Sequence, residues 1–269
     1  MLILSLFDNI YITVVMKDFK TLVNSDYVGK TSIFFVGQAG FIIKSSSGQL
    51  VAIDLYLSNC VERYEGNVGY KRLVPELFSP DDLIFDFLIC THPHLDHLDL
   101  DSFPCLINNG TTIAMCSIEC EKFINDLHLR DCSDRIYYIK PFDSFDFGDI
   151  KIDFVNCDHG AGAPDAVGVV IHVDGKTIYE TGDTCLRLDR INEIPKDLDI
   201  LIAPINGSFG NLDESECVQL AKALQPKMTI PCHYGMFASH HGDVGKFYEK
   251  MIENDLPFYI FQYGEGIVI

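Results

Sequence analysis

The sequence is poor in basic residues. It carries 20 lysines and arginines against 39 aspartates and glutamates, and its formal net charge is −19. A surface this negative repels the phosphates of nucleic acids and the headgroups of anionic lipids, so we expect neither a nucleic acid nor a membrane as a partner. A small anionic substrate could still bind where metal ions or a few cations reverse the local field.

A paired-cysteine motif is also missing. None of the ten cysteines stands in a CxxC pair, and a chain of 269 residues that is 48% hydrophobic can build a core without disulfides. We therefore expect reduced thiols and a cytoplasmic protein. Cys90, Cys157, Cys185 and Cys232 each stand beside a motif described below, and for them we favour core packing over a part in a site.

The chain also lacks a long hydrophobic run, a low-complexity linker and a short repeat. The apolar N-terminal segment "MLILSLFDNIYITVVM" is too short to span a bilayer, and no cleavage site of small residues follows it. We interpret it as an additional strand, or as the result of an early start where Met16 is the natural one. We expect a single domain over residues 1–269, with residues 1–25 as a candidate N-terminal extension, and a homo-oligomer is compatible with this chain.

Hydrophobic patterns predict strands, a helix, more strands, a second helix and final strands. The helices are expected over residues 117–129, with Ser117 as a candidate N-cap, and over residues 214–224, capped by Asp213. Strands are predicted within residues 30–37, 40–46, 49–57, 83–91, 135–141, 149–157, 167–175, 176–183, 198–204, 227–233 and 257–263. This order fits two sheets packed face to face with helices outside them.

The stretch "THPHLDHLDLD", residues 91–101, follows a strand that is predicted to be buried. Alternate residues of an extended chain point to the same side, so His92 and His94 can converge on one point. Asp96 and His97 follow after a turn and can face a second point nearby. Imidazole and carboxylate groups are common ligands of Zn, Mn and Fe, and four of them in six residues indicate a metal site.

Three later strands end in further candidate ligands. His159 follows the strand "DIKIDFV", Asp183 stands in the turn of "YETGDTC", and His233 follows "KMTI". Each alone would be interpreted as a surface turn residue, but loops at strand ends gather into functional sites. We interpret Asp99 and Asp101 more simply, as acids at a helix start and on the surface.

The order of these ligands resembles that of the metallo-β-lactamase fold superfamily. The resemblance extends from about residue 30 to the C-terminus and includes Asp54, the acid that ends an early strand. It implies an α/β (α+β) fold, a four-layer αββα sandwich of two mixed sheets with helices on the outer faces. It also implies a site for two divalent metal ions, for which Zn or Mn is expected and Fe is compatible.

The resemblance implies a role for each candidate ligand. Three histidines would hold the first metal ion: His92, His94 and His159. A second trio would hold the other ion: Asp96, His97 and His233. Asp183 would bridge the two ions, and Asp54 would orient the ligand loop without binding metal.

Three segments are similar to the L-ascorbate-6-phosphate lactonase-like branch: "PDAVGVVIHVDGKTIYETGDT", "APINGSFGNLDESECVQLAKALQPKMTIPCHYGMF" and "PFYIFQYGEG". Two residues depart from the lactonase, because Cys185 and Tyr234 stand where it has histidines. The resemblance implies a hydrolase that attacks a lactone or a phosphorylated sugar-like molecule with a hydroxide shared by two metal ions. Asp96 and Asp183 are the candidate catalytic residues.

Candidate substrate contacts are fewer and less specific. Asn206 and Ser208 lie in the loop "INGSFGN", and Tyr234 and His241 follow the last ligand. For His241 we favour a solvated loop over a substrate contact. Two other functions stay open, a phosphodiesterase acting on a phospholipid-like or nucleotide-like substrate, and a non-hydrolytic diiron redox protein or metal-dependent binding module.

Overall fold

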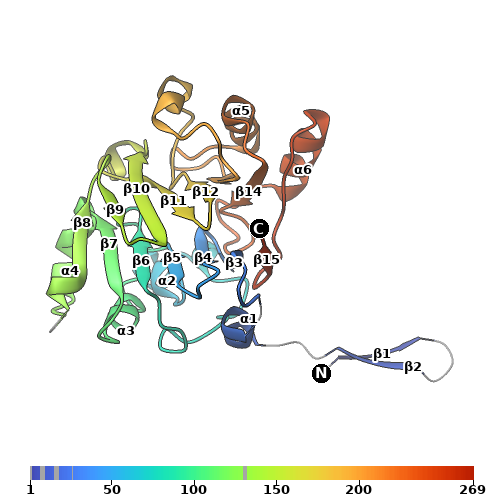
Figure 1. Ribbon diagram of the computed structural model, residues 1–269, viewed down its shortest axis with the longest axis horizontal. Helices are drawn as coiled ribbons and strands as arrows, with labels where there is room; N and C mark the ends of the chain where they lie inside the picture. The colour runs from blue at the N-terminus through green and yellow to red at the C-terminus, as the bar shows by residue number, and fades with distance from the viewer. Residues whose placement is uncertain (1, 7–9, 15–17, 26, 130–131) are drawn as a thin grey trace.

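The computed structural model describes residues 2–6, 10–14, 18–25, 27–129 and 132–269. Strands of these residues form two large mixed sheets and a separate hairpin, in which β1 (Leu2–Leu6) pairs with β2 (Ile10–Val14). Figure 1 shows the hairpin extending away from the rest of the chain. The N-terminal segment predicted as one additional strand thus contains two.

The first sheet has seven strands, in the order β15-β3-β4-β5-β6-β7-β8. Their bounds are β3 Ser32–Gly37, β4 Gly40–Lys44, β5 Leu50–Ile53, β6 Phe87–Cys90, β7 Ile113–Ser117, β8 Ile136–Ile139 and β15 Gly266–Val268. The early strands form an antiparallel meander, whereas β5, β6, β7 and β8 run parallel. The carboxyl ends of the parallel strands therefore meet at one edge, and the ligand stretch begins where β6 ends.

The second sheet has six strands, in the order β14-β13-β12-β11-β10-β9. Their bounds are β9 Ser144–Asp146, β10 Ile150–Asn156, β11 Val167–Val173, β12 Lys176–Glu180, β13 Ile200–Pro204 and β14 Met228–Cys232. The predicted strands at 167–175 and 176–183 form the hairpin of β11 and β12, and Asp174 and Gly175 of its tight turn both have positive φ. Because β12, β13 and β14 are parallel, their ends bring Asp183 and His233 to the same edge.

Helices cover the outer faces of both sheets (Figure 1). The α-helices are α1 Phe19–Ser25, α2 Cys60–Glu65, α3 Phe103–Ile107, α4 Glu121–Asp126, α5 Glu214–Leu224 and α6 Val244–Glu253. The 3-10 helices are η1 Val68–Tyr70, η2 Ile118–Cys120, η3 Ser133–Arg135, η4 Gly160–Gly162 and η5 Leu188–Glu193. This arrangement confirms the predicted fold class, two mixed sheets with helices outside.

The core is divided by the sheets into layers. Ile33, Ile43, Ile89, Ile152 and Ile202 belong to one buried cluster formed by strands of both sheets. Separate buried clusters lie under the helices on each outer face. Phe19 and Val23 of α1 are buried in one of these, so that part of the candidate extension packs into the domain.

Two predicted elements differ from the structure, and a third is confirmed. Ser117 ends β7 and caps no helix with its side chain, because the chain continues into η2 before α4 begins at Glu121. The predicted strand at 257–263 reduces to one isolated bridge between Thr229 and Phe258. The helix at 214–224 is confirmed, with a capping box between Asp213 and Glu216.

Two absences can be stated for the described part of the chain. No helix in it is both long enough and apolar enough to cross a membrane. No disulfide joins any of its cysteines, and eight of these are buried. Cys90, Cys157 and Cys232 are among the buried thiols, which agrees with the packing role favoured for them, while Cys185 is half-buried.

Candidate metal centre

The ligand stretch is anchored by Asp54, at the end of β5. The carboxylate of Asp54 accepts hydrogen bonds from the backbone N–H and the hydroxyl of Thr91, at 2.8 and 2.6 Å. Its Oδ2 also lies 2.7 Å from Nδ1 of His97. A proton on that Nδ1 leaves Nε2 of His97 as a lone pair that faces the other ligands, which is the usual arrangement around metal-binding histidines.

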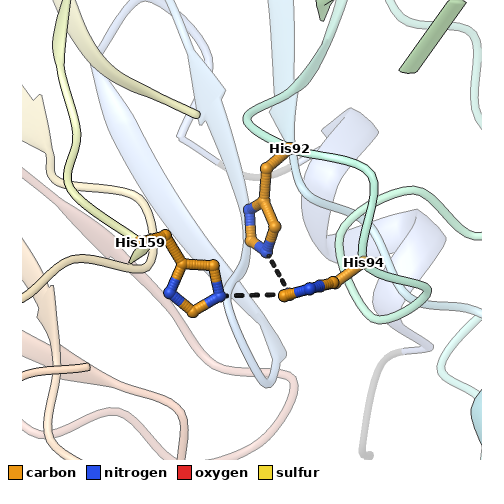
Figure 2. Close-up of side chains that lie close together, drawn as sticks. All are labelled: His92, His94 and His159. Carbon is orange, nitrogen blue, oxygen red and sulfur yellow. Dashed lines mark hydrogen bonds between the residues drawn. The ribbon is translucent and has the colours of Figure 1, made fainter. Parts of the chain in front are cut away.

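Three histidines converge on the first candidate position. Nδ1 of His94 lies 2.9 Å from Nε2 of His92 and 3.1 Å from Nε2 of His159 (Figure 2). A ring nitrogen can share only one proton with a neighbour, so three facing nitrogens need something between them. Ligand atoms of one tetrahedral ion stand about 3.3 Å apart when each is roughly 2.0–2.1 Å from it. The trio therefore fits one metal ion.

A second group gathers beside the first. Nε2 of His97 lies 3.1 Å from Nε2 of His233, and both nitrogens lie 3.8 Å from Oδ2 of Asp96. Asp183 reaches both groups, since its carboxylate is 2.9 Å from His233, 3.4 Å from His97 and 3.7 Å from His159. Asp183 thus stands between the two groups of ligands.

Electrostatics favour the metal-binding form of His92, His159 and Asp183. At His97, by contrast, burial is outweighed by the carboxylates of Asp183 and Asp54, which raise its pKa well above the ordinary value. Burial lowers the pKa of His92 well below its ordinary value, and it lowers the pKa of His159 to about 4. Burial alone would raise the pKa of Asp183, but the nearby His233 and His97 hold it well below the usual range. Neutral imidazoles and ionised carboxylates are the forms that bind metal, and buried carboxylates are costly without a compensating cation.

Gln38 is a site residue that sequence reasoning missed. It stands in the turn between β3 and β4, and its Nε2 donates to Oδ2 of Asp96 at 2.8 Å and lies 2.9 Å from Nδ1 of His233. The backbone carbonyl of Gln38 also accepts a hydrogen bond from the backbone N–H of His233, at 2.8 Å. Gln38 therefore fixes two ligands of the second group; the only signal for it was a polar residue between two apolar strands.

Asp99 corrects the interpretation of a surface acid. It is buried, and its carboxylate accepts from the backbone of Leu57 and Ser58 and from the hydroxyls of Ser58 and Ser102. It therefore ties the ligand stretch to the segment after β5, just before α3 begins. Asp101 does lie near the surface, where it pairs with Arg63 at 2.6 Å.

Glu180 is a buried acid near the candidate ligands, and one of its carboxylate oxygens is unpaired in the described part of the chain. Oε1 of Glu180 accepts from the backbone N–H of Gly182 at 3.0 Å, and Oε2 has no partner among the described residues. Burial, together with the charge of Asp54, raises the pKa of Glu180 well above its ordinary value. Beside it, the thiol of Cys157 donates to the backbone carbonyl of Asp183 at 2.9 Å.

A cavity of about 480 Å³ opens over the ligands. His94, Asp96, His159, Asp183 and His233 all line it. Among the candidate substrate contacts, Asn206 also lines it, whereas Ser208, Tyr234 and His241 are not among its lining residues. The hydroxyl of Tyr234 donates instead to the carbonyl of Phe261 at 2.8 Å. His241 is exposed, as favoured for it, while the neighbouring His240 lines the cavity.

Two packed mixed sheets with a histidine and aspartate cluster at one edge define a metallo-β-lactamase fold. The profile of the β-lactamase superfamily domain matches residues 32–233. The chain is also 27% identical over 247 residues to a UPF0173 metal-dependent hydrolase of Carboxydothermus hydrogenoformans, covering 88% of this chain and 99% of the relative. The chain therefore belongs to the metallo-β-lactamase superfamily, among its UPF0173 metal-dependent hydrolases.

Solved structures share the fold at lower identity. Igni18, a metallo hydrolase from Ignicoccus hospitalis, matches with a TM-score of 0.68 and 20% identity over 89% of this chain and 98% of its own. An isothiocyanate hydrolase from Delia radicum gut bacteria matches with a TM-score of 0.70 and 19% identity, over 88% of this chain and 99% of its own. These likenesses support the fold. The class of substrate has to be inferred from the residues that line the cavity.

Proposed function

We propose that this protein is a hydrolase that uses two divalent metal ions to attack the carbonyl carbon of a small lactone or ester. The observation that carries the proposal is the pair of ligand groups joined by Asp183. His92, His94 and His159 would hold one ion, and Asp96, His97 and His233 would hold the other. Ligands of nitrogen and oxygen favour Zn or Mn and accept Fe, so we propose Zn or Mn.

The residues around the ions have distinct tasks in this proposal. Divalent ions bound here would lower the pKa of a coordinated water toward ~7 and polarise the carbonyl under attack. The Asp96 side chain is 17% exposed and lines the cavity, and Gln38 holds one of its oxygens. In this proposal Asp96 would accept the proton of the attacking water and pass it to the leaving oxygen. Asn206 would orient the substrate.

The charge of the cavity favours an uncharged substrate. Its lining includes Asp96, Asp183 and Glu65 but neither a lysine nor an arginine among the described residues. A phosphate group would meet no side-chain cation there apart from the metal ions, and a bidentate arginine is the usual partner of a bound phosphate. The lack of a side-chain cation favours a neutral lactone over the phosphorylated sugar-like molecule that the resemblance also implied. It argues equally against the alternative of a phosphodiester.

A substrate panel tests the proposal. Protein with a measured content of Zn or Mn is assayed against neutral lactones, acyl esters, phosphodiesters and an isothiocyanate, the last because one fold neighbour bears that name. We expect turnover of lactones or esters that depends on metal content. Asp183→Ala should reduce kcat/KM by more than the roughly 10–100-fold that partners of ligands cost.

The matched control is Asp189→Ala, an exposed acid paired with Arg187. It should keep full activity and full metal content. Phosphodiester turnover in the absence of ester turnover, or an iron chromophore with redox activity and no hydrolysis, would contradict the proposal. Equal activity in Asp183→Ala would remove its bridging role.

A further inference from the structure

Six residues that line the cavity beside the candidate ligands carry aromatic rings. We call this group the aromatic wall, and it consists of Tyr64, Tyr70, Phe123, Phe209, Phe237 and His240. They come from four parts of the chain: the α2 and η1 region, α4, the loop before α5, and the loop before α6. No sequence motif joins these segments.

Four rings of the wall hold one another in place. Tyr70 stacks on His240 with centroids 5.8 Å apart, and Phe209 lies 4.6 Å from the same imidazole. Phe237 meets Tyr70 edge to face at 5.7 Å. Nδ1 of His240 lies 3.2 Å from the hydroxyl of Tyr70 and 2.6 Å from that of Ser239, so the imidazole is held by its neighbours. The wall is therefore a formed surface.

No lysine or arginine of the described residues lines the cavity, although two cations lie over rings of the wall: Arg63 is 5.0 Å from the ring centroid of Tyr64, and Lys122 is 4.7 Å from that of Phe123. The guanidinium of Arg72 donates to the carbonyl of Tyr56 at 2.8 Å and to the hydroxyl of Tyr263 at 3.0 Å. Arg63 pairs with Asp101. The charged side chains that line the cavity are thus acidic apart from histidine, and Glu65 adds a carboxylate next to Tyr64.

We infer that the substrate carries a flat, uncharged aromatic group that packs against the aromatic wall while its scissile group faces the metal ligands. Aromatic side chains supply apolar area and favour offset or edge-to-face contact with another ring. Apolar cavities with a few converging polar groups are the usual form of small-molecule sites. This inference rests on the proposed hydrolase function, because that function decides which end of the substrate faces the ligands.

Matched acetate esters test the inference on the metal-loaded full chain. Phenethyl acetate, ethyl acetate and acetoxyethyl phosphate present the same acetyl group with an aromatic, a small and an anionic alcohol. In each reaction water adds to the acetyl carbon, the ester C–O bond breaks, and acetate and the alcohol leave. We expect kcat/KM for phenethyl acetate to exceed that for either other ester by about tenfold or more. A preference for the phosphate ester would overturn the inference.

Two variants assign the preference to the wall. Phe209→Ala should lower kcat/KM for phenethyl acetate by about five- to tenfold, and that for ethyl acetate by less. Phe142→Ala is the matched control, since both phenylalanines are exposed, at 63% and 68%, with positive φ, and Phe142 is outside the cavity. Tyr64→Arg places a cation at the rim and should shift the preference toward the phosphate ester. Equal losses in Phe209→Ala and Phe142→Ala would also overturn the inference.

A binding measurement separates failure of the inference from failure of the proposed function. N-phenethylacetamide keeps the aromatic group and replaces the ester with a slowly cleaved amide, and its binding can be followed by ligand-observed NMR. Binding that Phe209→Ala weakens and Phe142→Ala does not, without hydrolysis of any ester, would contradict the proposed function and support the aromatic site. Absence of binding by this amide, with ethyl acetate still hydrolysed, would overturn the aromatic site alone.

Discussion

The two sides of the cavity are built in different ways. On the ligand side, His92 and His97 are fully buried after the end of a central strand. The carboxylate of Asp54 fixes His97 by a hydrogen bond with Nδ1 of its ring. In the aromatic wall, Tyr64 of α2 and Phe209 of the loop before α5 are 61% and 63% exposed, whereas Phe237 is buried. The candidate ligands thus share the stability of the core, while the exposed rings of the wall depend on it much less.

In the proposed function, one side of the cavity carries out the reaction and the aromatic wall selects the substrate. A shift of the ligands would spoil both metal binding and the path of the attacking water, so hydrogen bonds from several elements hold them. The aromatic wall needs only shape and apolar area, which loops can supply and which substitution can change. The contrast predicts large effects on one side of the cavity and small ones on the other.

Removal of metal should give the largest effect on stability. Without cations the carboxylates of Asp96 and Asp183 both face His233 with no metal ion to offset their charge, whereas ions bound only to the folded chain stabilise it. At ~1,000 times Kd the gain is about 4 kcal/mol, or on the order of 10 °C in Tm for a chain of this size. Thermal unfolding before chelation, after chelation and after return of Zn or Mn measures this change. An unchanged Tm after complete chelation would contradict it.

The acids Asp99 and Asp101 should differ sharply although they are two positions apart. Asp99→Ala leaves the donors of Leu57, Ser58 and Ser102 without their acceptor and should destabilise the fold by about 3 kcal/mol. Asp101→Ala removes one exposed ion pair and should cost about 0–1 kcal/mol. Urea unfolding of both variants measures the free energies. Similar values would mean that Asp99 does not anchor the ligand stretch.

The gathering of the candidate ligands could be predicted because each is a distinctive residue type at the end of a predicted strand. The cluster that His92, His97 and Asp183 form in space follows from parallel strands whose ends meet at one edge. The fold class followed from the same pattern of strands and helices. Local hydrophobic periodicity could not set the start of α4, because tertiary pairing in β7 takes Ser117 into the sheet.

Gln38, Asp99 and the aromatic wall escaped prediction for one physical reason. Gln38 acts on Asp96, 58 positions away, and Asp99 acts on Leu57, 42 positions away. The wall joins Tyr70 to His240, which lies 170 positions further along the chain. Such partners are decided by tertiary packing, and a glutamine in a turn or a tyrosine in a loop carries no local sign of them.

Gln38 tests how far the hydrogen bonds on the ligand side support metal binding. Gln38→Met keeps the approximate volume and removes the amide that donates to Asp96 and contacts Nδ1 of His233, so metal affinity should fall by about 10–100-fold. Competition with a chromophoric chelator measures the affinity. Gln219→Met, on the exposed face of α5, is the control and should bind metal as the unchanged chain does. If Gln38→Met bound metal as tightly as the unchanged chain, Gln38 would support His233 only through its backbone carbonyl.

Glu180 gives the ligand side a pH dependence. Its folded-state pKa is raised, so its contribution to stability is fully present below its ordinary value of 4.5 and is lost as pH rises through the folded value. Glu180→Gln keeps an acceptor for Gly182 and does not titrate. In the chelated protein the variant should gain about 1 kcal/mol over the unchanged chain near pH 8, and this gain should shrink toward about pH 4. Urea unfolding across pH measures it; a gain that grows at low pH would reverse the assignment.

The aromatic wall should show the smallest effect on stability. Phe209→Ala removes a ring that is 63% exposed, and alanine meets the same left-handed backbone as phenylalanine, so the substitution reports on the side chain. We expect the free energy of unfolding to change by less than about 0.5 kcal/mol, as in Phe142→Ala, while selectivity between the acetate esters changes. Urea unfolding of both variants measures this. A loss above about 1 kcal/mol in Phe209→Ala alone would show that the wall is part of the core, and the contrast between the two sides of the cavity would no longer hold.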